Sequence, residues 1–397
     1  MVMNQFVAIP SPFPWAPGHV VTEAEYVLQQ QVLGGCKKRI YLVFLPGPVS
    51  SAFVELYSDW FEQFKITLVC DPKLIQSILT SIPTERYLNA AISHCFHVLD
   101  ERYGSLGWRS DDAGVSHYSH LSCGRISQKT SSTLYCHNIQ NDFSYNYYSL
   151  PPAFKPLPPR NLGLIESLIP GLSGRKLAIL NIREHRANGS AGLTYQCFIP
   201  LIKYLLARDY FIVDASHESK SCSSELDELG VFCYWRLPNK NFYLDIDLFS
   251  HASFYVGGGG ISHLAYALKI PSIWVGGLFP IGIPAHHGYV LPCRLYDRST
   301  GLALDKDMSF FEYLSLRSPW EDGYDCWAKT WGKGNPFNCY ELLKSKYIIE
   351  RPSPVALLNT FIALESSKSQ SDAYIETYPF DDVQSRPFIG SRVSPYF

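Results

Sequence analysis

The sequence predicts an α/β protein that is built on parallel β-sheets in two domains. Short segments rich in β-branched and aromatic residues alternate with segments at helical spacing, which is the pattern of strand–helix–strand units. Two of the expected strands, at residues 40–45 and 177–180, are almost continuously apolar, as strands are when helices cover both faces of their sheet. The length of 397 residues and a proline-rich segment at 150–159 indicate a boundary between two domains.

Composition excludes several classes of protein. A hydrophobic content of 46% with only 18% charged residues is enough to build sizeable cores, so the chain is not of the disordered class. The net charge of −2, with no block of lysine and arginine, argues against nucleic acid as a partner. The N-terminal residues lack the apolar region of a signal peptide, and no run of 18 apolar residues occurs, so we expect no membrane span.

The 11 cysteines are odd in number, and none are spaced as C-x-x-C. We therefore expect reduced thiols in a cytoplasmic protein rather than a zinc site or a disulfide framework. Five histidines lie between residues 94 and 137, but no carboxylate–histidine motif fixes their spacing. Solvated or hydrogen-bonded histidines are favoured there over a metal site.

In the first half, alternation is clear up to about residue 80 and weakens from 94 to 150. A helix is expected from Thr22, which can cap it, up to the glycines at 34 and 35. The other expected elements of this half are strands at 6–9, 40–45 and 66–70 and helices at 53–61 and 74–80.

In the second half, the alternation resumes after the proline-rich segment. Beyond Pro292 we expect no regular structure until a late helix at 355–364, and a loosely ordered tail from Ser366. The other expected elements are strands at 177–180, 210–213 and 231–234, helices at 162–169, 195–207, 224–229 and 245–251, and a strand–turn–helix–strand unit at 254–275.

A glycine turn inside this last unit is the feature around which we expect the chain to be organised. Four glycines, Gly257 to Gly260, follow a strand, and Ser262 stands where a helix begins. Because glycine has no Cβ, another molecule can approach the main-chain amides there, and a diphosphate is the kind of anion such a turn binds. No lysine follows the glycines, so this is not the common phosphate loop, and a plain strand–helix turn is the alternative.

Other candidate residues follow the expected strands, where parallel sheets bind ligands. Arg183 follows the strand at 177–180 and suits a phosphate, unless it is solvated or paired with Glu184 or Asp214. The loop at 235–241 has flat and polar groups suited to a base or ribose, but a plain surface loop is as good an interpretation. Asp245 and Asp247 are explained as first-turn acids of a helix. His19 is a candidate general base, or a loop residue before a helix.

Several motifs spread over most of the chain carry a family resemblance. They are PGHV at 17–20, VFLPGPV at 43–49, IR at 182–183, DYFIV at 209–213, FYVGGGGIS at 254–262 and ALKIP at 267–271. The second half resembles the C-terminal domain of GT-B glycosyltransferases. More narrowly, the chain resembles a poorly characterised bacterial family assigned to the glycosyltransferases.

The resemblance implies two Rossmann-like domains with a cleft between them. The N-terminal, acceptor-side domain would span 1–158, the donor domain 159–350, and a C-terminal helix and tail 351–397. The implied reaction is metal-independent transfer of a sugar from a nucleotide-sugar co-substrate, without a cofactor, to an unknown acceptor such as a glycan, a small molecule or a protein. Catalytic roles would fall to His19 and Arg183, and donor binding to Gly18, Arg183, Ser216, Pro238, Asn239, Gly258, Gly259, Gly260, Ser262 and His263.

Two other functions remain open on the same fold. A nucleotide-sugar epimerase or phosphorylase would use a similar donor site, and fold alone does not separate it from a transferase. A non-catalytic nucleotide-binding or assembly protein is the second alternative.

Overall fold

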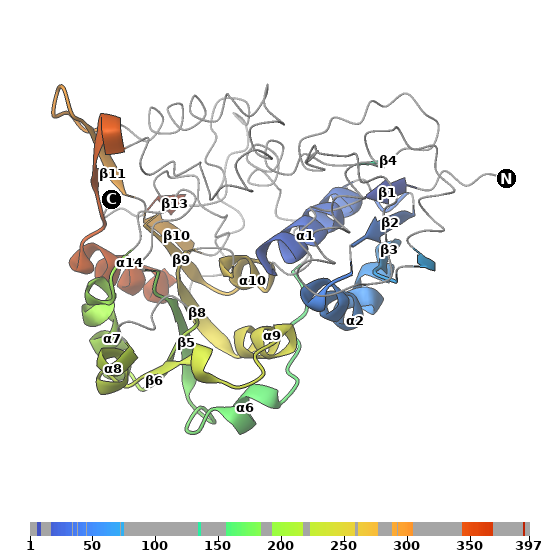
Figure 1. The fold of residues 1–397 in the computed structure, drawn as a ribbon, viewed down its shortest axis with the longest axis horizontal. Coiled ribbons are helices and arrows are strands. Elements are labelled where there is room, and N and C mark those ends of the chain that lie inside the picture. The colour runs from blue at the N-terminus through green and yellow to red at the C-terminus, as the bar shows by residue number, and fades with distance from the viewer. Residues whose placement is uncertain are drawn as a thin grey trace, which may run out of the picture. The chain divides into compact units, whose positions relative to one another are not determined.

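The chain divides into two compact units, the first comprising Met1–Pro158 with Ser318–Pro336 and the second Pro159–Arg317 with Phe337–Phe397. Parallel sheets flanked by helices form the frame of both, which confirms the predicted α/β class (Figure 1). The computed structural model describes residues 6–8, 17–33, 35–37, 39–44, 46–71, 73–74, 134–135, 156–183, 193–216, 223–258, 261–276, 288–291, 293–304, 344–367 and 392–393. The predicted helix at 74–80 and the five histidines between 94 and 137 lie outside these ranges, apart from residue 74.

The first unit contains a four-stranded sheet in the order β3-β2-β1-β4, with every neighbouring pair parallel. Two helices, α1 and α2, pack against each other, and α2 also packs on β3. Phe53 of α2 is fully buried and contacts the rings of Phe44, Tyr57 and Phe61. The elements are β1 (Phe6–Ala8), α1 (Pro17–Leu33), β2 (Ile40–Val43), α2 (Pro48–Glu62), β3 (Ile66–Val69) and β4 (Leu134–Tyr135).

Helix α1 begins at Pro17, five residues before the predicted start at Thr22. Proline is favoured at the first helical position because its missing N–H would have no partner there in any case. Gly18 and His19 therefore belong to the first turn of a helix, and the prediction that they lie in a loop is wrong. Gly18 is buried.

The second unit contains a seven-stranded parallel sheet in the order β13-β10-β9-β8-β5-β6-β7. Helices α7 and α14 lie on one side of it, and α9 and α10 on the other (Figure 1). The strands are β5 (Lys176–Asn181), β6 (Tyr210–Asp214), β7 (Val231–Cys233), β8 (Ala252–Gly257), β9 (Ser272–Val275), β10 (Gly288–Leu291) and β13 (Arg392–Val393). The helices are α6 (Leu164–Leu168), η2 (Tyr195–Phe198), α7 (Ile199–Leu206), α8 (Ser223–Glu228), η4 (Tyr234–Arg236), α9 (Phe242–Ser250), α10 (Ser262–Ala267) and α14 (Pro354–Ser367).

The order of the strands reverses between β5 and β8. The chain adds β6 and β7 on one side of β5, then returns to add β8, β9 and β10 on the other. Because crossovers between parallel strands are right-handed, the reversal puts the helices after β5 and after β8 on opposite faces. The first unit has the same beginning, since β2 and β3 extend one side of β1 and β4 pairs with the other. The sheet of the second unit is therefore doubly wound, and the strand order of the first unit reverses at β1.

The late helix α14 belongs to the core of the second unit. Leu357, Phe361 and Leu364 are buried in it, and the ring of Phe361 packs edge-on against Phe254 of β8, with the centroids 5.0 Å apart. A polar network fastens the end of the helix, because Glu365 accepts hydrogen bonds from the hydroxyls of Tyr204 (2.7 Å) and Tyr210 (3.2 Å).

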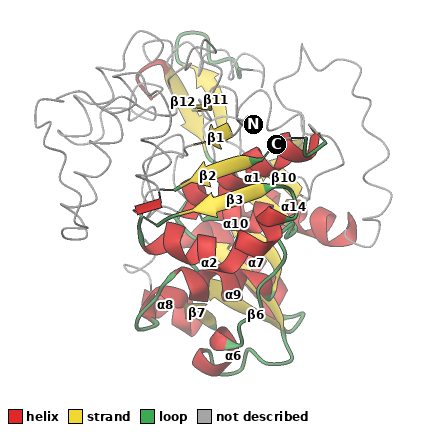
Figure 2. Ribbon diagram, turned by 90° about the vertical axis from the view of Figure 1, so that its right-hand side faces the viewer, coloured by secondary structure: helices red, strands yellow, loops and turns green. Residues whose placement is uncertain are grey.

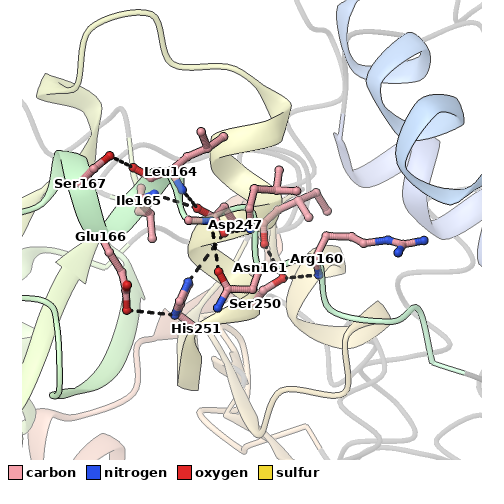
Figure 3. Close-up of polar contacts among 12 residues, drawn as sticks. Arg160, Asn161, Leu164, Ile165, Glu166, Ser167, Asp247, Ser250 and His251 are labelled. Carbon is pink, nitrogen blue, oxygen red and sulfur yellow. Dashed lines mark hydrogen bonds and ion pairs between the residues drawn. The ribbon is translucent and has the colours of Figure 1, made fainter.

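Helix α9 begins at Phe242, three residues before the predicted start, with Asn241 as its cap. Asp247 therefore lies inside the helix, and the prediction of a first-turn acid is wrong for it. Its fully buried carboxylate accepts main-chain N–H groups from Leu162 (2.6 Å), Leu164 (2.7 Å) and Ile165 (2.7 Å) (Figure 3). These bonds cap α6 and fasten the start of the second unit to α9.

Regular structure continues after Pro292, contrary to prediction. Strands β11 (Arg294–Asp297) and β12 (Tyr347–Glu350) form a separate antiparallel sheet (Figure 2). Leu295 and Tyr347 are buried, whereas Ile348 is exposed. The partners lie far apart in the chain, so no short turn between them marked a hairpin in the sequence.

Three features are not found in the described part of the chain. No helix there is both long enough and apolar enough to cross a membrane. The residues of those ranges also include no group of three or more histidine, cysteine or acidic side chains arranged to hold a metal ion. The described cysteines form no disulfide and are free thiols: Cys36, Cys70, Cys197, Cys233 and Cys293.

Candidate functional site

The candidate site lies at the carboxyl ends of β5, β6 and β8, beside the reversal of strand order. Asn181, the last residue of β5, pairs with Gly257 at the end of β8, and Leu180 pairs with Asp214 at the end of β6. The loops after β5 and β8 lead to opposite faces of the sheet. In open parallel sheets, ligands bind at this place. We call the following set the switch-point edge: Asn181, Arg183, Asp214, Ser216, Tyr255, Gly258 and Ser262.

Gly257 is required because β5 and β8 approach closely at this edge. A Cβ atom on Gly257 would lie 2.6 Å from Cβ and 2.8 Å from the carbonyl oxygen of Asn181. This proximity lets the Asn181 side-chain amide donate a hydrogen bond to the carbonyl oxygen of Gly258. Gly258 is itself close to β9, since its Cβ would lie 3.2 Å from the carbonyl oxygen of Val275. Packing between strands thus accounts for two of the four glycines.

Tyr255 places a buried hydroxyl under the turn. The side chain is 1% exposed, and its hydroxyl lies 3.5 Å from the carbonyl oxygen of Gly258, to which it donates. Burial raises the pKa of Tyr255, while hydrogen bonds with Asn181 and Ser262 and the charge of Arg183 act in the opposite direction. Residues from the ends of β5 and β8 and the start of α10 therefore meet at this hydroxyl.

Asp214 connects the loops that follow β5 and β6. Its fully buried carboxylate accepts the main-chain N–H groups of Ile182 (3.1 Å) and Ser216 (3.2 Å) at the same oxygen, Oδ1. A further bond, from the N–H of Ala215 to the carbonyl oxygen of Leu180 (2.8 Å), joins the two strand ends. Ser216, which was predicted to bind the donor, is only 3% exposed, so it is buried among the residues of the switch-point edge.

Arg183 is half-buried and lies two residues after β5, as predicted. Its carbonyl oxygen accepts the N–H of Leu193 (2.7 Å), which closes the loop between them. The guanidinium charge acts on the Tyr255 hydroxyl, so Arg183 belongs to the same edge as the glycine turn. Glu184, one of its two predicted alternative partners, lies outside the described residues.

The helix after the glycine turn is short. Ser262 is the first residue of α10, and Ile261 occupies the cap position, so Ser262 is a first-turn residue rather than the cap. Ser262 is 5% exposed and His263 is half-buried. Gly259 and Gly260 lie outside the described residues, so their predicted contact with a donor stays a prediction.

Pro238 and Asn239 are separated from the rest of the predicted site. Both are exposed on the loop after β7, and β6 lies between that strand and β5. Asn239 has a left-handed backbone (φ 56°), and its carbonyl oxygen accepts from the side-chain amide of Asn241 (3.2 Å). Neighbouring strands are about 4.8 Å apart, so this loop begins about 10 Å from β5.

A buried polar cluster beside this loop was not predicted. The Tyr234 hydroxyl donates to Asp245 (2.9 Å), and the Lys240 ammonium lies 4.3 Å from the centre of the Tyr234 ring. Burial raises the pKa of Asp245 and lowers that of Lys240, while the charges of Asp245 and Asp214 raise the pKa of Lys240. Lys240 and Asp214 of the switch-point edge therefore interact electrostatically. The sequence carried no signal for this cluster, because the position of Asp245 in the first turn of α9 already explained this acid.

Gly18 and His19 belong to the first unit. They occupy the first turn of α1, the helix after β1, and β1 is the strand at which the order of that sheet reverses. They therefore follow the strand at which the order reverses, which is the place where open parallel sheets bind ligands. The proposed contribution of His19 to catalysis stays a prediction.

Comparisons with known proteins gave no family model and no curated protein that matches the chain. Among solved structures, the E. coli heptosyltransferase WaaC with ADP is 12% identical, covers 79% of this chain and 98% of its own, and has a TM-score of 0.35. The E. coli ADP-heptose lipopolysaccharide heptosyltransferase II is 14% identical, with coverage of 80% and 99% and a TM-score of 0.35. A Listeria monocytogenes protein described as a UDP-N-acetylglucosamine 2-epimerase is 13% identical, with coverage of 86% and 95% and a TM-score of 0.31. Likenesses at these scores assign no family to the chain.

Proposed function

We propose that this protein is a glycosyltransferase that moves a sugar from a nucleotide-sugar donor to an acceptor of unknown class. The observation that carries the proposal is the switch-point edge, where polar groups from three strand ends converge beside the reversal of strand order. Doubly wound sheets bind nucleotides at this place, because the loops on either side lead to opposite faces. Arg183 supplies a positive charge there, and the glycine turn supplies a main chain that a diphosphate can approach.

In this proposal the two units form a GT-B arrangement, with the donor on the second unit. Arg183 and the turn Gly258 to Gly260, with Ser262 and His263, bind the diphosphate and stabilise the charge that develops on it as it leaves. Ser216, Pro238 and Asn239 contribute to the nucleoside side of the site, and Gly18 lines the donor from the first unit. The reaction uses no cofactor and no metal ion.

The chemical step in this proposal needs a base for the acceptor hydroxyl. His19 takes the hydroxyl proton while the acceptor oxygen bonds to the anomeric carbon, and the bond from that carbon to the diphosphate oxygen breaks. The nucleoside diphosphate leaves with the electron pair of the broken bond. Imidazole suits this role because its ordinary pKa lies near neutrality.

A thermal-shift screen against UDP-, GDP-, ADP-, dTDP- and CMP-sugars tests the proposal. Ligand at about 100 times its dissociation constant adds about 2.7 kcal/mol to the free energy of unfolding. Arg183→Ala is expected to weaken binding of the diphosphate-containing ligand by about 1.5–3 kcal/mol, and binding of the bare nucleoside hardly at all. Arg175→Ala is the matched control, since Arg175 lies before the start of β5 and pairs with Asp209 (3.1 Å).

Two results would contradict the proposal. A protein that none of these donors stabilises is not a nucleotide-sugar enzyme. Incubation of the stabilising donor without any acceptor separates the transferase from the epimerase, because only an epimerase returns an isomerised donor.

A further inference from the structure

The carbonyl oxygen of Gly258 receives two hydrogen bonds from buried side chains. The Asn181 side-chain amide donates to it from the end of β5, and the Tyr255 hydroxyl donates from β8 at 3.5 Å. Asn181 is 5% exposed and Tyr255 is 1% exposed. A carbonyl oxygen has two lone pairs, so these two donors together satisfy it.

Two buried donors on one carbonyl fix the orientation of a whole peptide group. A peptide is planar, so a carbonyl that cannot rotate holds its peptide plane and the direction in which the chain leaves β8. Glycine has the freest main chain of all residues, and four glycines in a row would otherwise leave this direction undetermined. The two donors supply the constraint that the sequence of the turn lacks.

The surroundings of the two donors are built to keep them in place. Gly257 has no Cβ, and this absence admits Asn181, whose own Cβ would otherwise be 2.6 Å away from it. The Tyr255 ring packs against Phe249 of α9, with the centroids 5.7 Å apart. Neither donor carries a charge, so they hold the carbonyl without repelling or neutralising an anion that binds nearby.

We propose that Tyr255 and Asn181 are positioning residues that hold the Gly258 peptide in the orientation that binding of a diphosphate requires. This inference rests on the proposed function, because that function places the donor diphosphate at the glycine turn. It assigns the pair to the diphosphate half of the ligand and not to the nucleoside half. Neither residue touches the ligand.

The test compares two tyrosines of one sheet. Tyr255→Phe removes only the hydroxyl and keeps the packed ring. Tyr210→Phe is the matched control, because Tyr210 is 3% exposed and its hydroxyl donates to Glu365 at the opposite end of the sheet. Tyr210→Phe loses the part-buried bond to Glu365, and Tyr255→Phe loses the bond to Gly258 together with the hydrogen bonds with Asn181 and Ser262. A purely structural role predicts a lower melting temperature in both variants and nothing else.

Binding of inorganic pyrophosphate, UDP and uridine, and hydrogen exchange of a peptide spanning residues 254–268, are measured on both variants. Should the screen identify another base, the corresponding diphosphate and nucleoside replace UDP and uridine. Tyr255→Phe is expected to weaken pyrophosphate and the nucleoside diphosphate about tenfold, the usual scale of one hydrogen bond, and to leave the nucleoside unchanged. It is also expected to speed exchange in the 254–268 peptide. Tyr210→Phe should change none of these.

Different failures have different meanings. If Tyr255→Phe binds pyrophosphate as tightly as the wild type, or if Tyr210→Phe weakens it equally, the positioning role is overturned while the proposed function stands. If the wild type binds neither pyrophosphate nor any nucleoside diphosphate, the proposed function and the diphosphate role fall together. The exchange data still decide in that case whether the pair holds the turn. Asn181→Ser, which shortens the second donor, is expected to repeat the Tyr255→Phe result.

Discussion

Asp214 and Asp247 are both fully buried aspartates of the second unit, and both accept hydrogen bonds from main-chain N–H groups. Asp247 uses both of its oxygens, and its three donors all lie within residues 162–165 at the start of α6. At Asp214, the Oδ1 atom accepts from two donors, Ile182 and Ser216, which lie in loops after neighbouring strands. The same type of side chain, a buried aspartate, therefore caps a helix in one region and joins two loops of the switch-point edge in the other. A buried charge alone therefore does not mark a site, and the segments that it joins must be considered.

The largest expected effect is on Asp247, because an amide cannot replace it. In Asp247→Asn the side-chain NH₂ would face a main-chain N–H, so at least one buried donor loses its acceptor. The free energy of unfolding is expected to fall by about 3–5 kcal/mol in urea denaturation, with nucleotide affinity unchanged in the folded protein. Ser250→Ala, which removes the acceptor of the Arg160 N–H (2.9 Å), is the control and should cost about 1 kcal/mol. A loss below that of the control would refute the capping role.

A smaller effect is expected at Asp214, because the N–H groups of Ile182 and Ser216 both bond to Oδ1, which an amide oxygen can replace. Asp214→Asn keeps a carbonyl oxygen that can accept both, and should lower the free energy of unfolding by only about 1 kcal/mol. Asp214→Ala leaves the N–H groups of Ile182 and Ser216 without that acceptor, and should cost about 2–3 kcal/mol and abolish stabilisation by the nucleotide sugar. Equal loss of ligand stabilisation in both variants would mean that the charge, rather than the tie between loops, matters to the site.

The smallest effect concerns Glu365, a third carboxylate, which accepts hydrogen bonds from the titratable hydroxyls of Tyr204 and Tyr210. Burial, followed by the charge of Glu365, raises the pKa of Tyr210 to about 12, above its unfolded value of about 10. The proton is bound more tightly in the folded state, so this stabilisation is complete below pH 10 and is lost as the pH rises through 12. Tyr210→Phe should therefore flatten the fall in the free energy of unfolding between about pH 10 and 12, measured by denaturant titration at several pH values.

A Tyr210→Phe variant whose free energy of unfolding falls as steeply as that of the wild type between about pH 10 and 12 would refute this coupling.

Much of the sheet was predictable, because strands covered on both faces are apolar along their whole length. The start of α9 was not, since the acids at 245 and 247 outweighed the cap at Asn241, whose side chain accepts the N–H of Leu244 (3.1 Å). The β11–β12 pair was missed because its register joins residues 50 to 56 positions apart, from Asp297 with Tyr347 to Arg294 with Glu350, and no local pattern records such a pairing.

The candidate site was predictable to the extent that it lies at strand ends. Arg183, Gly258 and Ser262 were found because each follows an apolar segment, and the structure brings them to one edge. Tyr255 was not assigned to the site, because a residue inside an expected strand is explained by the sheet alone. Asn181 follows the expected strand at 177–180, but it has no charge that pointed to a phosphate. The polar cluster of Tyr234, Lys240 and Asp245 forms only in the folded chain, and hydrophobic periodicity does not record contacts of this kind.

The place of α14 has a consequence for how the protein is made. Phe361 covers Phe254, yet about a hundred residues must be added to the chain between the two. At about 5–20 residues per second, the ribosome needs about 5–20 s for that interval. During this interval the ring of Phe254 in the nascent sheet lacks its contact with Phe361. A chaperone that binds exposed aromatic segments would therefore have its best access to the newborn chain before residue 361 leaves the exit tunnel.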